Sequence, residues 1–282
     1  MLRFYGYALL LHGYIGWRLL PDMPSAALGW AMALWLAASM CLVPLGLVAR
    51  RIRTQPLSDA LSWAGLLAIG SFSSLLVLTF IRDLVLLCAS GLLGWAIEAD
   101  ALKLFQSWSA VAVPTLAALF TIVGLVNARR LARVRSVDVP IAGLPASLHG
   151  FTIAQISDVH IGPTIKGRYL DAIVDAVNEL DADMIAITGD LVDGSVKQLS
   201  RHTQPLSRLT ARHGAYFVTG NHEYYSGVGA WVCELRRLGL RVLMNEHVVL
   251  DHEGSNVVVA GVTDYSAHYF DPAQKSDPAA AI

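Results

Sequence analysis

Charged residues are spread very unevenly along this chain, and their distribution limits what the chain can fold into. Residues 26–48, 60–81 and 108–126 contain no Asp, Glu, Lys or Arg. Each stretch is close to the ~20 apolar residues that an α-helix needs to cross the hydrocarbon core of a bilayer. The whole chain is 15% charged, against about 25% in a typical soluble domain, and the deficit lies in residues 1–128. We therefore predict a transmembrane domain over residues 1–128, followed by a domain in water.

The transmembrane domain is predicted to contain four helical spans, at residues 4–20, 26–48, 60–81 and 108–126. The first span contains His12 and Arg18, and Arg18 lies close enough to the end of the span for its guanidinium to reach the interface. Leu84–Ile97 is apolar but too short for an ordinary crossing. Arg82 and Asp83 separate it from the preceding span and leave no room for a loop, so we expect an interfacial or re-entrant segment.

Two arginine clusters predict the orientation of the protein. One cluster occupies residues 50–53, after the second span, and the other occupies residues 129–135, after the fourth. An even number of crossings puts both clusters on the same side, and an excess of Lys and Arg marks the cytoplasmic side. We therefore expect a multi-pass integral protein of an inner or plasma membrane. Its basic juxtamembrane linker, residues 129–136, and the soluble domain after it, residues 137–282, should face the cytoplasm.

Net charge and cysteine content argue against other classes of protein. The formal net charge is −1, so the chain lacks the basic excess that is typical of nucleic-acid-binding proteins, and we expect no nucleic acid partner. The three cysteines have a spacing that fits no zinc or disulfide framework.

Residues 137–282 have the periodicities of an α/β domain. Short apolar runs predict strands, and a helical spacing of apolar residues, such as Leu170, Val174 and Val177, predicts helices. The expected strands are residues 137–141, 151–157, 184–188, 215–219, 241–244 and 256–262, and the expected helices are residues 168–180, 196–209 and 229–238. Strands that alternate with helices favour a layered α/β fold, in which ligands bind beyond the carboxyl ends of the strands.

Three polar clusters follow the carboxyl ends of three predicted strands. They are Asp158-Val159-His160, Gly189-Asp190 and Gly220-Asn221-His222-Glu223. An isolated Asp-x-His is common on protein surfaces, but three clusters separated by one helix–strand unit at each step indicate one shared site. Carboxylate, imidazole and amide oxygen together suit Mn, Fe or Zn ions, and the glycines allow the sharp turns that direct side chains into a pocket.

The order of these clusters resembles the signature of the calcineurin-like metallophosphoesterase family. The segments SDVHIG, TGDLVDG and TGNHEYYSG are most similar to a membrane-associated, multi-span branch of it, and the resemblance covers residues 137–282. It implies a β-sandwich flanked by helices, two divalent metal ions of the Mn, Fe or Zn type as cofactors, and hydrolysis of a phosphomonoester or phosphodiester. Two cations about 3.5–4 Å apart clamp a phosphate and stabilise both the attacking and the leaving oxygen.

The resemblance also implies roles for six residues. Asp158 and His160 would bind the first metal, Asp190 would bridge both metals, and Asn221 would bind the second metal through its amide oxygen. His222 would stand near the leaving group as the general acid, a role for which an imidazole is well suited. Glu223, which follows directly, would orient His222 or cap the next helix.

One departure from the family pattern concerns the remaining metal ligands. The chain contains no Gly-His-x-His segment, and the histidines at positions 247, 252 and 268 do not follow strand ends as the pattern requires. We therefore expect a C-terminally incomplete copy of the domain, in which the second metal keeps Asp190 and Asn221 alone and at most one metal is held tightly. The alternative is a catalytically inactive copy that acts as a membrane-bound binding or structural protein.

Other polar residues near the clusters are assigned to loops. Asp193 and His213 are expected to be loop residues, and Asp193 is placed where it could lie just behind the metal ligands. Membrane attachment favours a lipid-linked phosphoester as the substrate. The predicted spans contain no internal carboxylates or lysines, which argues against a transport pathway through them.

Overall fold

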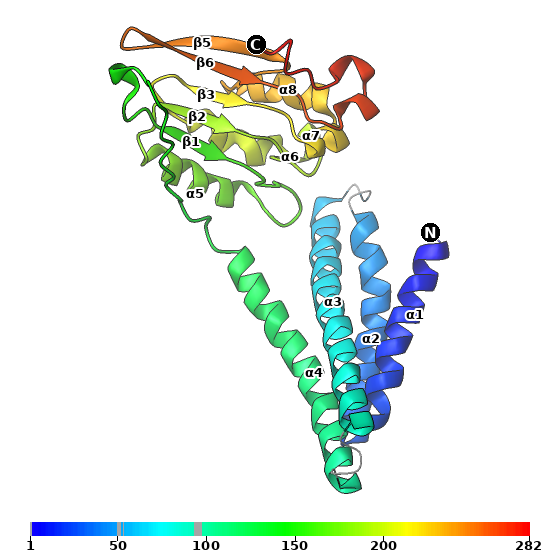
Figure 1. Cartoon of the computed structure of the whole chain (residues 1–282). Helices are drawn as coiled ribbons and strands as arrows, with labels where there is room; N and C mark the ends of the chain where they lie inside the picture. The colour runs from blue at the N-terminus through cyan, green and yellow to red at the C-terminus, as the bar shows by residue number, and fades with distance from the viewer. Residues whose placement is uncertain (1, 50–51, 53, 93–97) are drawn as a thin grey trace. The chain divides into compact units, whose positions relative to one another are not determined.

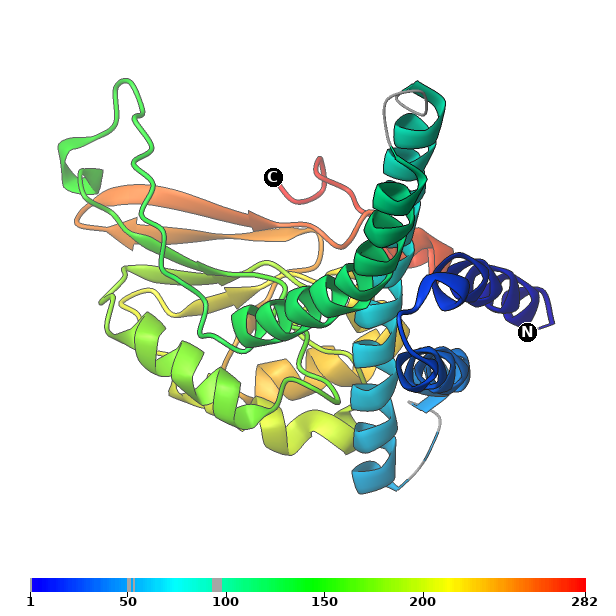
Figure 2. The ribbon, with the colours of Figure 1, turned by 90° about the horizontal axis from the view of Figure 1, so that it is seen from below.

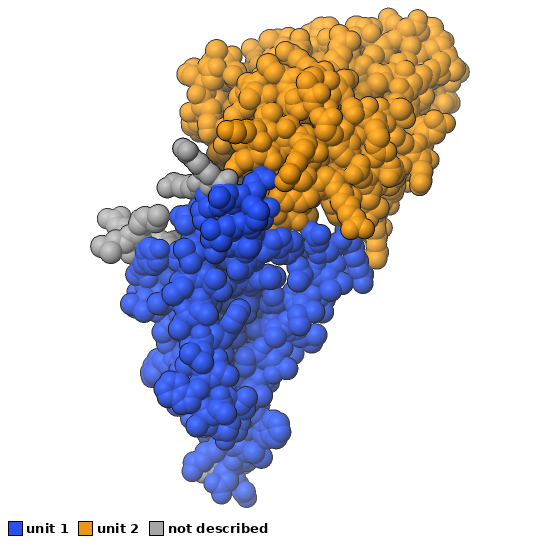
Figure 3. Space-filling model, turned by 180° about the vertical axis from the view of Figure 1, so that it is seen from behind, with its two compact units in different colours: residues 1–130 blue, residues 131–282 orange. Residues whose placement is uncertain are grey.

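The computed structural model describes residues 2–49, 52, 54–92 and 98–282. The chain divides into two compact units, Met1–Arg130 and Leu131–Ile282, which are coloured separately in Figure 3. Each unit buries a hydrophobic core of its own. Two separate cores are expected when one part of a chain is adapted to lipid and the other to water.

The first unit is helical, as Figure 1 shows. It contains α1 (Leu2–Leu19), α2 (Ala26–Val48), α3 (Gln55–Leu92) and α4 (Ala99–Ala128), with the short 3₁₀ turn η1 (Leu20–Asp22) after α1. Among the described residues, three stretches are long and apolar enough to cross a membrane, namely Ala26–Val48, Gln55–Gly91 and Asp100–Ala128. Helix α1, which overlaps the predicted first span, is not one of the three.

Helix α3 runs without a break through Arg82 and Asp83, which corrects the prediction of a separate segment at Leu84–Ile97. Leu84–Leu92 belongs to α3, and residues 93–97 lie outside the described residues. The two charges need no loop, because groups on the other helices and on η1 pair with them inside the bundle. Arg82 donates to Asp22, Ser109 and the carbonyl oxygens of Arg18 and Gln106, and Asp83 accepts from Tyr14 and Arg18.

Close backbone packing and a buried histidine connect the helices of this unit. Gly46 and Gly65 meet where α2 crosses α3, and a Cβ added to Gly65 would come 2.3 Å from the Cα of Gly46. His12 of α1 is buried, hydrogen-bonds to Ser39 of α2 at 3.1 Å and stacks on Phe72 of α3. Small residues and hydrogen bonds between helices are the usual means by which helices pack in a bilayer.

The second unit has three layers, as Figures 1 and 2 show. A parallel sheet in the order β1-β2-β3-β4 lies between three helices on one face and the antiparallel hairpin β5–β6 on the other. The strands are β1 (Ile153–Ile156), β2 (Met184–Ile187), β3 (Ala215–Phe217), β4 (Arg241–Val242), β5 (Glu246–His252) and β6 (Ser255–Gly261). The helices are α5 (Gly167–Asn178), α6 (Val196–Thr203), α7 (Asn221–Ser226) and α8 (Val228–Arg237). The 3₁₀ turns are η3 (Ala146–Leu148), η4 (Gln204–Arg208), η5 (Ala267–Tyr269) and η6 (Pro272–Gln274).

Alternation along the strands divides the interior of this unit into two cores. Ile185 and Phe217 pack with residues of α5, α6 and α8. Met184 and Tyr216, each one position earlier in the same strands, pack with Leu250 of the hairpin. This is the period of two that a strand buried on both faces requires. The two β layers and the flanking helices confirm the predicted fold class.

Apart from the short helix α7, which was not predicted, and from small differences at element ends, the structure differs from the predicted elements at three places. Residues 137–141 form no strand, so that prediction is wrong; Pro140 has no N–H to donate to a strand ladder. The predicted helix at residues 196–209 ends at Thr203 and continues as the turn η4, because Pro205 cannot complete the helical hydrogen bonds. Strand β5 was not predicted. Its buried and exposed residues alternate because one of its faces packs against the sheet and the other faces solvent.

Candidate metal centre

The three polar clusters lie together beyond the carboxyl ends of β1, β2 and β3. Parallel strands present these ends at the same edge of a sheet, so the loops that follow them meet there. The Asp158 amide donates to the Gly189 carbonyl oxygen at 3.3 Å, and the His160 amide donates to the Asp190 carbonyl oxygen at 3.0 Å. The backbone therefore joins the first two loops directly.

Three of the predicted metal ligands have a left-handed backbone. The angle φ is +56° at Asp158, +51° at His160 and +50° at Asp190. Asp and His adopt this region more readily than most residues, but it still costs of order 1–3 kcal/mol per residue. Such strain persists where the surrounding structure enforces it, and it is concentrated at functional sites. Here it occurs at three residues that were selected from the sequence for their chemistry.

Gly189 and Gly220 allow the second and third loops to approach each other. Gly189 has a φ of +83°, and a Cβ there would lie 2.4 Å from the Gly220 amide nitrogen. A Cβ on Gly220 would lie 2.2 Å from Oδ1 of Asp190. The approach allows the Asp190 carboxylate to accept a hydrogen bond from the His222 amide at 3.0 Å. Both glycines are therefore required by close packing around Asp190.

The buried carboxylate of Glu223 holds these two loops together. It accepts hydrogen bonds from four backbone amides, those of Asp190, Leu191, Val192 and Gly220, at 2.8–3.2 Å. Burial raises the pKa of Glu223, and the four hydrogen bonds act against that increase. Glu223 therefore caps α7, which is one of the two roles expected from the sequence. It also fixes the loop that carries Asp190.

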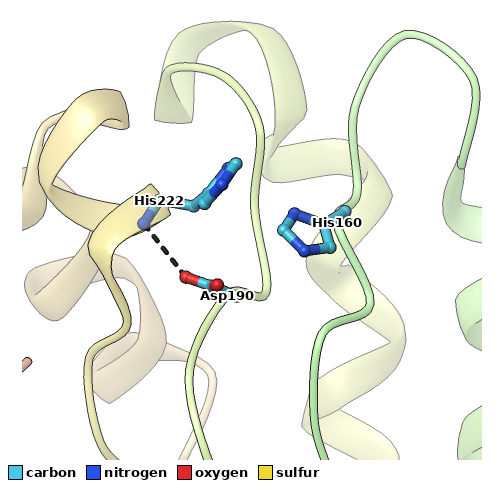
Figure 4. Close-up of side chains that lie close together, drawn as sticks. All are labelled: His160, Asp190 and His222. Carbon is cyan, nitrogen blue, oxygen red and sulfur yellow. Dashed lines mark hydrogen bonds between the residues drawn. The ribbon is translucent and has the colours of Figure 1, made fainter.

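His160, Asp190 and His222 form a group that could hold a metal ion. One ligand atom from each residue lies within 4.8 Å of the other two, and all three residues are half-buried. Figure 4 shows the three side chains converging from three different segments of the chain. The imidazole rings of His160 and His222 have centroids 4.5 Å apart. Within the part of the chain that the structure describes, this is the one such group of His, Cys, Asp and Glu side chains.

Asp158 and Asn221 lie at the edge of this group. Oδ1 of Asp158 is 3.9 Å from Nε2 of His160, and its side chain is 66% exposed. The amide nitrogen of the Asn221 side chain donates a long hydrogen bond of 3.5 Å to the Tyr225 hydroxyl. The amide oxygen is then the atom of Asn221 that is left for a metal ion.

Asp193 lies in a loop, as predicted, and it stands directly beside the two histidines of the group, which is the second position that the sequence allowed for it. Its Oδ1 hydrogen-bonds to Nδ1 of His222 and lies 3.6 Å from Nδ1 of His160. The segment GDLVDG contained the signal, because it has a second carboxylate three residues after Asp190. The Asp193 amide donates to the Ile161 carbonyl oxygen at 2.7 Å, so the loop folds back towards His160.

The later histidines lie outside the metal group. His252 is buried and shares a hydrogen bond of 2.9 Å with His213. His247 bonds to the Ala281 carbonyl oxygen, and His268 bonds to the Tyr265 carbonyl oxygen. Among the described residues, the structure therefore brings none of these four histidines to His160 and Asp190.

The ligand atoms in the group fit a divalent metal ion. Metal–nitrogen and metal–oxygen bonds of ~2.0–2.2 Å put neighbouring ligand atoms roughly 3.4 Å apart in a tetrahedral site. Ligand atoms within 4.8 Å of one another would have to move closer by up to about 1.4 Å to reach that geometry. Two imidazoles and one carboxylate suit Zn, Fe or Mn ions.

Comparison with known proteins agrees with this geometry. The sequence profile of the family described as "Calcineurin-like phosphoesterase" matches residues 151–275, which contain β1 to β6 and the metal group. A "Transmembrane protein with metallophosphoesterase domain" from Danio rerio is 37% identical over 156 residues, which are 54% of this chain and 36% of that protein. One of the same description from Bos taurus is 39% identical over 166 residues, 55% of this chain and 37% of that protein.

A more distant relative covers a smaller region. The "UDP-2,3-diacylglucosamine pyrophosphatase LpxG" of Chlamydia muridarum is 35% identical over 80 residues, 28% of this chain and 24% of that protein. No solved structure gives a significant match. The chain spans about a third of the length of the two transmembrane relatives, 36% and 37%. Proteins of the matched family use divalent metal ions, and the match of residues 151–275 to the calcineurin-like phosphoesterase family confirms the resemblance seen in the sequence.

Proposed function

We propose that this protein is a metal-dependent phosphoester hydrolase that its first unit anchors in a membrane. The observation that carries the proposal is the convergence of His160, Asp190 and His222 at the strand ends of a calcineurin-like domain. Divalent ions bound there would polarise a phosphate and provide a nucleophile at neutral pH. The substrate is a phosphomonoester or a phosphodiester.

Asp158, His160, Asp190 and Asn221 are the proposed ligands for two such ions. Asp158 and His160 would hold the first ion from the loop after β1, and Asn221 would hold the second from the start of α7. Asp190 is suited to bridge the two ions because it contacts both the loop that carries His160 and the segment that carries Asn221 and His222. Its carbonyl oxygen accepts from the His160 amide and its carboxylate accepts from the His222 amide. A shared carboxylate also offsets the repulsion between two close cations.

His222 is the proposed general acid, with Asp193 as the residue that positions it. The hydrogen bond that Nδ1 of His222 donates to the Asp193 carboxylate would fix the orientation of the imidazole and leave Nε2 for the leaving oxygen of the substrate. A carboxylate behind an imidazole commonly serves in this way, both at metal sites and in proton transfer. The side chain of Asp193 is 13% exposed, which limits competition from water for this bond.

A lipid-linked phosphoester is the proposed substrate. The apolar helices of the first unit support it, because an enzyme held at a bilayer meets phosphates carried by lipids at high local concentration. The name of the Chlamydia muridarum relative gives that protein a diacylated sugar nucleotide as its substrate. The 80 residues that align with this relative belong to the phosphoesterase domain. The relative therefore supports a lipid-containing class of substrate and no particular compound.

An activity screen of the full chain tests the proposal. We expect p-nitrophenyl phosphate or bis-p-nitrophenyl phosphate to be hydrolysed in the presence of Mn, Fe or Zn ions. The activity should disappear with EDTA, return when the metal is restored, and be absent from Asp190→Asn. A preparation that holds metal by elemental analysis and hydrolyses neither ester would contradict an enzymatic role and favour a binding protein instead.

A further inference from the structure

Two aromatic side chains stand next to the metal group and are open to solvent. Tyr225, at the end of α7, is 64% exposed, and Phe270, after η5, is 47% exposed. Their ring centroids lie 5.4 Å apart at an interplanar angle of 70°. We refer to this pair, Tyr225 and Phe270, as the aromatic wall.

The aromatic wall is continuous with the residues proposed to act on the phosphate. The Tyr225 ring lies 5.5 Å from the His222 ring, at an angle of 78°, and the Tyr225 hydroxyl accepts the long hydrogen bond from Asn221. Tyr225 therefore touches both the proposed general acid and a proposed metal ligand. Any group attached to a phosphate at the metals, on the side of His222, would pass close to this ring.

Phe270 is held in place although it comes from a distant part of the sequence. Its ring packs 5.5 Å from Tyr224, which is buried beneath it on α7. The base of its loop is anchored by the buried residue Thr263, whose amide and hydroxyl donate to the Asn245 side chain and whose hydroxyl lies 2.8 Å from the Gln274 carbonyl oxygen. The Asn245 side chain also donates to the Lys275 carbonyl oxygen at 2.8 Å. The aromatic wall is thus preorganised, and a bound group would not have to order the loop that carries Phe270.

The chemistry of the wall is apolar. The rings that make it up or contact it are those of His222, Tyr224, Tyr225 and Phe270, so it brings no Lys or Arg to the side of the phosphate. None of these four side chains carries a permanent positive charge, so the wall itself offers no ion pair to an alcohol that carries further phosphates. Aromatic faces instead favour the burial of alkyl chains and flat rings.

We propose that the aromatic wall binds an apolar group attached to the scissile phosphate and so selects alkyl or aryl phosphoesters over small or highly charged ones. This inference rests on the proposed function for its substrate class, and it assigns the selection to Tyr225 and Phe270. The apolar group could come from a membrane lipid or from a soluble ester. The shared requirement is an apolar chain or ring joined to the phosphate oxygen.

Binding of two phosphonates tests the wall independently of catalysis. Hexylphosphonate and ethylphosphonate have the same head group, so their interactions with the metals are the same and they differ in chain length alone. With the full, metal-loaded chain in nanodiscs, we expect calorimetry to show about tenfold or tighter binding of hexylphosphonate. Phe270→Ala should weaken hexylphosphonate about 3–10-fold and leave ethylphosphonate within about twofold, and Tyr225→Ala, which also removes the hydrogen-bond partner of Asn221, should weaken hexylphosphonate more than ethylphosphonate.

Tyr265→Ala is the matched control. Tyr265 is an aromatic residue before η5 that is 81% exposed and contacts His268, so its loss should change neither affinity. Equal affinities for the two phosphonates in the wild type, or an equal effect of Tyr265→Ala, would overturn the inference. Displacement of hexylphosphonate by phosphatidic acid in the nanodisc would identify a lipid source, and lack of displacement would identify a soluble one.

Turnover separates this inference from the proposed function. Hexyl and ethyl phosphate release alcohols of similar acidity, so a preference for the hexyl ester in kcat/KM reports on packing. A wild-type protein that prefers hexylphosphonate and hydrolyses neither ester would retain the aromatic wall and contradict the enzymatic role. Hydrolysis of both esters at equal rates, unaffected by Tyr225→Ala, would contradict the wall and retain the enzyme.

Discussion

At Gly220 the loops that carry Asp190 and His222 approach so closely that a hydrogen is the largest substituent that fits. A Cβ at this position would lie 2.2 Å from Asp190 Oδ1 and 2.6 Å from the Asp190 amide nitrogen. We predict that Gly220→Ala displaces the Asp190 carboxylate and lowers metal affinity at least about tenfold. Gly229→Ala is the control, because its Cβ would meet nothing within 4 Å, and a helical alanine should raise stability by about 0.5–1 kcal/mol. Metal titration and thermal unfolding of both variants check the prediction. Unchanged metal affinity in Gly220→Ala would show that Asp190 is not a ligand.

His222 has two possible roles at the scale of a single side chain, and its substitution separates them. As a general acid, His222→Ala should keep the metal content and slow turnover by about 10²–10⁴-fold. The loss should be small for a nitrophenyl ester and large for an alkyl ester, because a good leaving group needs no proton. Asp193→Asn should show the same pattern with a loss of about 10–100-fold. If elemental analysis showed that His222→Ala loses metal and both esters slowed equally, His222 would be a metal ligand, as its place beside His160 and Asp190 also permits.

Among the elements, the hairpin β5–β6 depends on polar contacts at the edge of the sheet as well as on its apolar face. His252 of β5 bonds to His213 at 2.9 Å and packs against Phe151 at 4.9 Å between ring centroids. Asp183, just before β2, accepts hydrogen bonds from the Thr152 amide at 2.7 Å and the Thr152 hydroxyl at 3.1 Å. These contacts join the segments that enter β1, β2 and β3 to the end of β5.

Asp183 should make the stability of the second unit sensitive to acid. Burial alone would raise the pKa of Asp183, but hydrogen bonds from Thr152, with His252 and Arg212 nearby, lower it below its ordinary 3.8. A lowered pKa means that the contribution is present above pH 3.8 and is lost as the pH falls through the folded-state value. We predict that Asp183→Asn destabilises the unit by about 1 kcal/mol at pH 7, with a difference from wild type that shrinks towards pH 3. Thermal unfolding at several pH values measures this, with the exposed Asp138→Asn as control. A difference of the same size at pH 7 and pH 3 would contradict the assignment.

Local patterns in the sequence predict much of the second unit, because its strands, turns and site residues are encoded close to one another. Asp158, Asp190 and Asn221 each follow a strand, so the layered fold and the site could be located together. Features that depend on distant partners are harder to predict. The continuity of α3 depends on the pairing of Arg82 with residues of other elements, and the place of Asp193 depends on a loop that folds back on Ile161. Sequence periodicity carries no information about either partner.

At the scale of the whole molecule, the two units accommodate their charged side chains in different ways. In the first unit, charged groups such as Arg82 and Asp83 are paired with groups of other elements, as charged groups are where water does not reach them. In the second unit, the acidic residues of the site remain partly open to solvent, where metal ions and a phosphate can reach them. The chain thus joins a set of apolar helices to a candidate metal site that is partly open to solvent.

The orientation of the chain in the membrane is the prediction that belongs to this scale. The arginines at residues 50–53 and 129–135 are separated by α3 and α4 alone, so they share a side of the membrane whether or not α1 crosses it. The arginines at 50, 51 and 53 lie outside the described residues, so their side of the membrane is inferred from their position in the sequence. Each Arg near an anionic cytoplasmic surface contributes about 1 kcal/mol, so we expect both clusters, and the metal centre after them, on the cytoplasmic side. A reporter that is active in the cytoplasm should work when fused after Arg135 and fail when fused after Pro24, which precedes α2. Activity at Pro24 and none at Arg135 would place the metal centre on the opposite side of the membrane.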